Sequence, residues 1–290
     1  HPYGYQMPDY SKKQTATPDD LSKPLTPLQG KELQEKLGVC RWIIDNVIPA
    51  LTFALGRVAC KVGNPTVQVL REVNRLIMHM AGTQNPAIQF KPTQNMQLGV
   101  FSDASFSSEQ RSRSRIGGVL FIGGLNKDNE PETAAIQVIS EVSNIVADSA
   151  AEAEYIAVHA VMKRAVHIRY ILEDLGFAQD TTIHRCDNKC AVGLANKTTN
   201  DKRTKHIHRR IHWVQDQTEL SIFNVIWEPG STNIADFFTK PMSKKEQEKM
   251  SQIFGLQCDS EGMPIAEEGV LGLRWKHGIR SSITPWTEQN

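Results

Sequence analysis

The chain has 290 residues, 40% of them hydrophobic and 22% charged, with a formal net charge of +1 at pH 7. This composition is typical of a globular protein of one large or two ordinary domains, and the near-neutral balance excludes nucleic-acid binding through net charge alone. No apolar run is long enough for a membrane span and no signal peptide opens the chain, so we expect an intracellular protein. The five cysteines lack paired CxxC spacing, which favours reduced thiols over disulfides or structural zinc.

The first third of the chain divides into two predicted segments. Residues 1–30 are rich in proline and polar residues, which predicts an extended N-terminal arm that docks on a partner. Residues 31–92 show helical spacing, with a break at Pro49. Asn64-Pro65-Thr66 predicts an N-cap followed by proline at the first helical position, and Gly82 ends that helix. We therefore expect a small helical module.

Residues 93–242 show a different pattern of hydrophobic residues. Three apolar runs separated by turn residues predict an antiparallel meander of strands, namely Leu98–Ser102, Ile116–Ile122 and Ala134–Ile139. The remaining predicted elements are a long helix (Ala150–Leu175), a strand (Thr182–Cys186), a short helix (Lys189–Ala195), a basic helix (Arg203–Gln217), a strand (Ser221–Trp227) and a last helix entering at Asn233. This order predicts an α/β fold with a mixed five-stranded sheet and flanking helices.

Several acidic residues lie where these predicted elements begin or end. Asp103 and Asp187 each follow a strand, Glu152 lies in the first turn of the long helix, and Asp236 lies near the start of the last helix. Taken singly, each has a structural explanation as a turn former, a cap or a partner of the helix dipole. Glu154 points to a different face from Glu152 and is interpreted as structural. Two strand ends and two helix starts can nevertheless form one converging site.

Five segments, in order and at matching spacing, resemble the ribonuclease H domain of copia-type (Pseudoviridae) long-terminal-repeat retrotransposon polyproteins. They are Ser102-Asp103-Ala104-Ser105, Ala150–Ala157, Cys186-Asp187-Asn188, Arg203–Ile207 and Ala235–Met242. The helical module is similar to the reverse-transcriptase connection that precedes ribonuclease H in that family. The resemblance runs from about Leu33 to Met242.

The resemblance implies a ribonuclease H-like fold that hydrolyses the RNA strand of an RNA·DNA hybrid and leaves a 3'-hydroxyl. It also implies two Mg²⁺ or Mn²⁺ ions, with Asp103, Glu152, Asp187 and Asp236 as catalytic and metal-binding residues, because such hydrolysis uses hard oxygen ligands around a metal pair. Hybrid or structured RNA is expected to contact a mainly basic set of residues: Arg113, Arg115, Asn188, Arg203, Lys205, His206, Arg209 and Arg210. For the basic helix, a merely solvated face is the alternative.

Departures from the family pattern support a second function. Gln137–Asn144 replaces a lysine-rich stretch, Glu228 stands where a neutral residue is expected, and no polymerase palm precedes the helical module. The alternative is a domesticated, catalytically silent copy that serves as a structural or RNA-binding subunit of a large ribonucleoprotein assembly. Residues 1–30 and the C-terminal tail, residues 243–290, would then contact other protein chains. A plain interaction domain is a third possibility.

Overall fold

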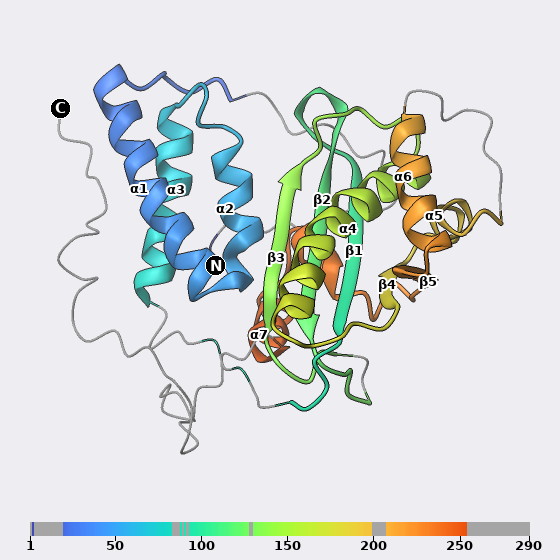
Figure 1. The fold of residues 1–290 in the computed structure, drawn as a ribbon. Helices are drawn as coiled ribbons and strands as arrows, with labels where there is room; N and C mark the ends of the chain where they lie inside the picture. Colours follow the sequence, from blue (N-terminus) through green and yellow to red (C-terminus); the bar gives the residue numbers. More distant parts are fainter. Residues whose placement is uncertain are drawn as a thin grey trace, which may run out of the picture. The chain divides into compact units, whose positions relative to one another are not determined.

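The computed structural model describes residues 20–82, 93–127, 130–198 and 207–253, together with Pro2, Ile88 and Phe90. The chain divides into two compact units, one of residues 91–240 and one of residues 1–90 with 241–290 (Figure 1). In the part that the structure describes, no helix is long and apolar enough to cross a membrane.

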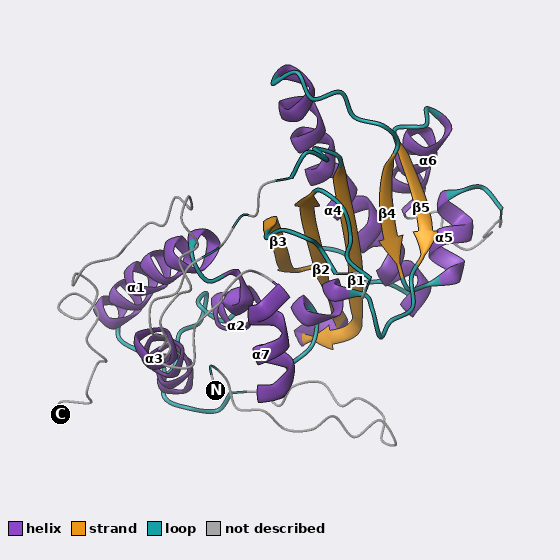
Figure 2. Ribbon diagram, turned by 90° about the horizontal axis from the view of Figure 1, so that it is seen from below, coloured by secondary structure: helices purple, strands orange, loops and turns teal. Residues whose placement is uncertain are grey.

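The unit of residues 91–240 is built on one five-stranded sheet in the order β3-β2-β1-β4-β5, whose strands lie side by side in Figure 2. Strands β1, β2 and β3 form the antiparallel meander, while β4 runs parallel to both β1 and β5. Their bounds are Leu98–Glu109, Arg113–Ile122, Ala135–Val142, Thr182–Cys186 and Phe223–Trp227. The mixed five-stranded sheet expected from the sequence is confirmed.

Helices cover both faces of this sheet. Gly117 and Gly118 are neighbours on β2, so their side-chain positions point to opposite faces. A Cβ atom at Gly118 would meet Val161 of helix α4 (Ala150–Asp174), whereas a Cβ atom at Gly117 would meet the 3-10 helix η4 (Ile234–Phe238). Helix α4 and η4 therefore lie on opposite sides of β2. Helices α5 (Lys189–Ala195) and α6 (His208–Glu219) also pack against α4.

The last element of this unit differs from the expectation. The predicted helix entering at Asn233 is only the short η4, capped by the Asn233 side chain, which accepts from Ala235 N at 3.1 Å. The following proline explains the early stop, because Pro241 disfavours helical geometry at the preceding residue. A separate helix, α7 (Lys244–Ile253), follows and belongs to the other unit.

The second unit is all-helical in its described part, with its own core of aliphatic residues. Its elements are α1 (Pro27–Asn46), the 3-10 helix η1 (Pro49–Leu51), α2 (Thr52–Ala59), α3 (Val67–Gly82) and α7, which packs on η1. Thr66 caps α3 by accepting from Val69 N at 3.3 Å, so the predicted cap at Asn64 was placed two residues early. Pro27 begins α1 behind the capping residue Thr26, so the last residues of the predicted N-terminal arm are helical.

Candidate active site

The sheet register places two of the predicted carboxylates side by side. Ser102 of β1 pairs with Cys186 of the parallel strand β4, so the next residues, Asp103 and Asp187, lie at the same level of the sheet. The Asp103 side chain is 1% exposed, and it lies within β1 rather than at its end, because β1 continues to Glu109. Neighbouring parallel strands thus bring Asp103 and Asp187 together, although 84 positions separate them in the numbering.

Helix α4 contributes Glu154 to this site and not Glu152. The Glu152 carboxylate accepts a hydrogen bond from the Asp148 backbone N–H at 2.9 Å, in the first turn of α4. Glu154 lies 200° further round the helix by ideal geometry, roughly the opposite face. Its carboxylate accepts a hydrogen bond from the Ala104 backbone and interacts with the charges of Asp103 and Asp187. The placement expected for the two glutamates is therefore reversed.

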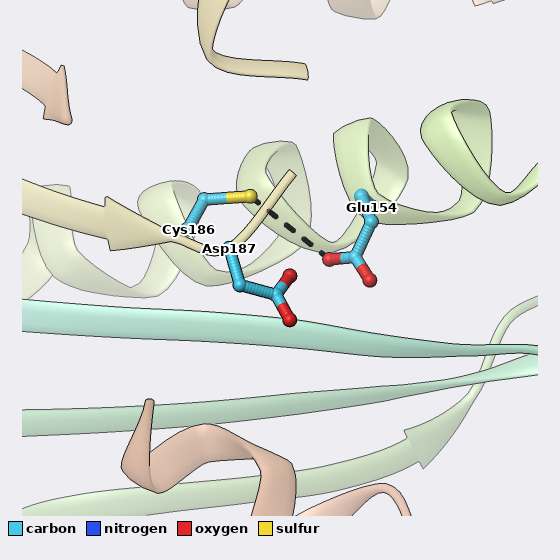
Figure 3. A group of neighbouring side chains, drawn as sticks. All are labelled: Glu154, Cys186 and Asp187. Carbon is cyan, nitrogen blue, oxygen red and sulfur yellow. Dashed lines mark hydrogen bonds between the residues drawn. The ribbon is translucent and has the colours of Figure 1, made fainter. Parts of the chain in front are cut away.

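Figure 3 shows Glu154 projecting from α4 towards the end of β4, where Cys186 and Asp187 lie. One potential ligand atom from each of these three residues lies within 4.8 Å of the others. The Cys186 thiol contacts Glu154 Oε2 at 4.0 Å, and burial raises the thiol pKa well above its usual value. The thiol therefore stays protonated and acts as a neutral neighbour of Glu154.

The fourth carboxylate, Asp236, comes from η4. Asn233 fixes this short helix to β1 by donating from Nδ2 to the Ser102 carbonyl at 2.9 Å. Asp236 then interacts electrostatically with both Asp103 and Asp187. We call Asp103, Glu154, Asp187 and Asp236 the carboxylate centre, and each of them comes from a different element.

Two further side chains next to Asp236 complete the site. The Thr239 hydroxyl donates a hydrogen bond to Asp103 Oδ2, and the Lys240 ammonium pairs with Asp236 Oδ1. Both residues lie in the segment that carries the fifth family-like motif. The motif itself could have identified them, but only its aspartate, Asp236, was predicted as a site residue.

Burial and neighbouring charges raise the pKa of three carboxyl groups of the centre, those of Asp103, Glu154 and Asp187. Burial is the main cause that raises the pKa of Asp103 to about 7, and the charges of Asp236 and Asp187 raise it further against the opposing effects of Lys240 and Thr239. Burial, followed by the neighbouring aspartates, raises the pKa of Glu154 well above its usual value. The pKa of Asp187 is raised as well, mainly by burial. A centre of converging, partly buried carboxylate oxygens fits a hard divalent cation such as Mg²⁺ or Mn²⁺.

The residues predicted to contact nucleic acid lie in varied environments. Arg115 is fully buried, with Nε bonded to Glu109 Oε1 at 2.6 Å and Nη1 to Ser140 Oγ at 3.2 Å, which contradicts a phosphate contact in this conformation. The Asn188 side chain caps α5 by accepting from Cys190 N and Ala191 N. Arg209 is exposed, Arg113 and Arg210 are half-buried, and Arg203, Lys205 and His206 lie outside the described residues.

The unexpected Glu228 does not approach the carboxylate centre as an uncompensated charge. Its side chain is buried, accepts a hydrogen bond from Thr232 Oγ1 and lies 3.8 Å from Arg185 Nε. The Arg185 guanidinium in turn lies over the Phe101 ring, 5.3 Å from its centroid. The negative charge of Glu228 is thus compensated locally by Arg185 and Thr232.

Comparison with known proteins identifies the relatives of the chain. No protein-family model matches it. The retrovirus-related Pol polyprotein from transposon TNT 1-94 of Nicotiana tabacum is 27% identical over 213 residues, which are 73% of this chain and 15% of the polyprotein. The corresponding polyprotein from transposon RE1 of Arabidopsis thaliana is 26% identical over 72% of this chain and 14% of the polyprotein. The homologues are thus copia-type Pol polyproteins, and this chain spans about one seventh of their length.

Among solved structures, the chain is similar to LC11-RNase H1, an enzyme isolated from compost by a metagenomic approach. The sequence identity is 14%, the TM-score is 0.38, and the match covers 54% of this chain and 99% of that enzyme. Residues 91–240 form a mixed five-stranded sheet with flanking helices.

Proposed function

We propose that the chain is a metal-dependent ribonuclease of the ribonuclease H type, which hydrolyses the RNA strand of RNA·DNA hybrids. The observation that carries the proposal is the convergence of four carboxylates from β1, α4, η4 and the end of β4, beside the central strand of the sheet. Each could be explained singly as a turn or cap residue. Together, with Asp103 and Glu154 buried and Asp187 and Asp236 half-buried, they form the kind of cluster that metal-assisted phosphodiester hydrolysis uses.

The four carboxylates of the centre would hold two divalent ions. When bound, the ions would supply an activated water and neutralise charge on the scissile phosphate. The protein's own part is to present the ligands: Thr239 orients the Asp103 carboxylate, and the Ala104 backbone N–H orients that of Glu154. Such partners fix ligand geometry and are worth about 10-fold to 100-fold in metal affinity.

The exposed residue Arg209 and the half-buried residues Arg113 and Arg210 are proposed phosphate contacts of the substrate. For α6 the structure is consistent with this role, because Ile211 and Val214 are buried and leave the basic side of the helix outward. Arg115 is withdrawn from the set because it is buried.

The proposal is tested with the 290-residue chain, Mg²⁺ and a labelled RNA·DNA hybrid. We expect cleavage of the RNA strand with 3'-hydroxyl products, no cleavage of duplex DNA, and loss of activity in Asp103→Asn and Asp187→Asn. Folded wild-type protein that leaves the hybrid intact in both Mg²⁺ and Mn²⁺ would refute the enzyme and favour the catalytically silent subunit.

A further inference from the structure

Lys240 extends its ammonium group into the carboxylate centre. Its Nζ pairs with Asp236 Oδ1, and its charge also acts on Asp103, Glu154 and Asp187. Burial alone would lower the pKa of Lys240, but the three aspartates of the centre together raise it above its usual value. Lys240 is therefore a cation that interacts with every carboxylate of the centre.

Such a cation offsets the repulsion between carboxylates that the fold brings together. Four carboxylates that converge in a partly buried site repel one another, because the low effective dielectric constant there strengthens the interaction between like charges. Protonation and a nearby positive charge are the two ways to relieve this repulsion without a bound metal. Lys240 is attached four residues after Asp236, and its side chain is 42% exposed, so the ammonium can leave towards solvent.

We propose that Lys240 is a built-in counter-ion of the carboxylate centre, which holds the centre together before metal binds and which the metal must displace. The inference rests on the proposed function, since it assigns Lys240 a role in metal binding at the same site. Lys240 and the metal compete for the same oxygens, so the ammonium weakens the first metal-binding step. Lys240 is in this sense a positioning residue, and it sets the metal concentration at which the site fills.

The test compares Mn²⁺ binding to the full chain by calorimetry in four variants. Lys240→Met and Lys240→Gln remove the charge, Lys240→Arg keeps it, and Lys163→Met removes an exposed lysine of α4 as the matched control. Loss of the competitor should lower the dissociation constant of the first Mn²⁺ by about tenfold or more in the two neutral variants. The arginine variant and the control should stay within about threefold of wild type.

A second readout is the melting temperature with and without Mn²⁺. Without metal, the neutral variants should melt at a lower temperature than wild type, and Mn²⁺ should raise their melting temperature by more than it raises that of wild type. Two neutral variants are compared so that the result does not depend on the folding of one of them. If both fail to fold without metal, recovery of the fold by Mn²⁺ supports the proposal and failure to recover opposes it.

The outcomes separate this inference from the proposed function. If wild type binds Mn²⁺ and the neutral variants bind it as tightly as wild type or more weakly, the counter-ion role is overturned. The proposal of a metal centre is then unaffected. Absence of Mn²⁺ binding in wild type and in both neutral variants overturns the metal centre and the counter-ion role together.

Discussion

At the scale of single residues, the centre depends on which of two glutamates faces the sheet. Asp103 and Asp187 are predictable because each follows an apolar run, but the sequence favours Glu152 as the ligand where the structure places Glu154 beside the aspartates. All four residues from Glu152 to Tyr155 are buried, so the start of α4 is covered on every side. The sequence there has no solvent-facing polar side from which the sheet-facing side could be predicted. Only the tertiary contact with β1 settles that Glu154 joins the aspartates. Arg115 was misjudged for a related reason, since alternation in a strand does not tell which side is covered.

Thr239 gives a test of how the Asp103 carboxylate is held. Thr239→Val keeps the shape of the side chain and removes the hydroxyl that donates to Asp103. We expect Mn²⁺ affinity and hybrid cleavage to fall by about 10-fold to 100-fold, as for other partners of metal ligands. Thr239→Ser, which keeps the hydroxyl, should stay close to wild type. Equal behaviour of the valine and serine variants in Mn²⁺ calorimetry would show that the hydroxyl has no such role.

The raised pKa of Asp103 predicts how metal-free stability varies with pH. The pKa is about 7 in the folded chain and 3.8 in the reference state, so the folded chain binds the proton more tightly between these values. The contribution of this carboxyl group to the free energy of unfolding is fully present below pH 3.8. It is lost as the pH rises through 7, by up to about 4 kcal/mol in total. Asp103→Asn should therefore be more stable than wild type at pH 8, with a smaller gain at pH 5.

The measurement for this prediction is chemical denaturation of metal-free protein across that pH range. Asp174→Asn replaces an exposed carboxylate at the end of α4 and serves as the control, with little expected effect at either pH. A gain in Asp103→Asn that is the same at pH 5 and pH 8 would contradict the assignment of a raised pKa to Asp103.

At the scale of elements, the centre depends on how closely η4 approaches the sheet. The order of strands and helices was predictable because their hydrophobic periods are distinct, and the meander and α4 lie where the sequence places them. The position of η4 was not predictable, because a 3-10 helix of five residues has no period of its own. It is fixed by side-chain hydrogen bonds from Asn233 to the β1 backbone and from Ser140 Oγ of β3 to the Phe238 carbonyl, and by the absence of a side chain at Gly117.

Gly117→Ala tests this close approach. A Cβ atom there would lie 2.6 Å from both the Ala235 carbonyl oxygen and Thr239 Cγ2, so η4 must move away from β2. We expect a loss of about 1–3 kcal/mol in the free energy of unfolding and a loss of Mn²⁺ affinity, because Asp236 moves with η4. Gly38→Ala, where the new Cβ meets nothing within 4 Å in α1, should be neutral or stabilising. Unchanged stability and metal affinity in Gly117→Ala would show that η4 can shift without consequence.

At the scale of the whole molecule, the sequence indicated a helical module and an α/β domain, and the structure has two compact units of those classes. The C-terminal helix α7 groups with the helical unit, which no sequence pattern indicated because its partners lie some 200 residues earlier. The roles proposed for residues 1–30 and 243–290 fall mostly outside the described residues and stay predictions. The mixed five-stranded sheet and the copia-type relatives agree with the expectation from the sequence, so the activity of the carboxylate centre is the question that matters most.

The most direct measurement is Mg²⁺-dependent cleavage of an RNA·DNA hybrid by wild type, Glu154→Gln and Glu152→Gln, all as the 290-residue chain. The two glutamates lie two residues apart on the same helix, so each variant controls for the other. We predict that wild type cleaves the RNA strand, that Glu154→Gln loses activity by about a thousandfold or more, and that Glu152→Gln stays within about threefold of wild type. Loss of activity in Glu152→Gln with retention in Glu154→Gln would contradict the assignment of the centre, and an inactive wild type would contradict the proposed function itself.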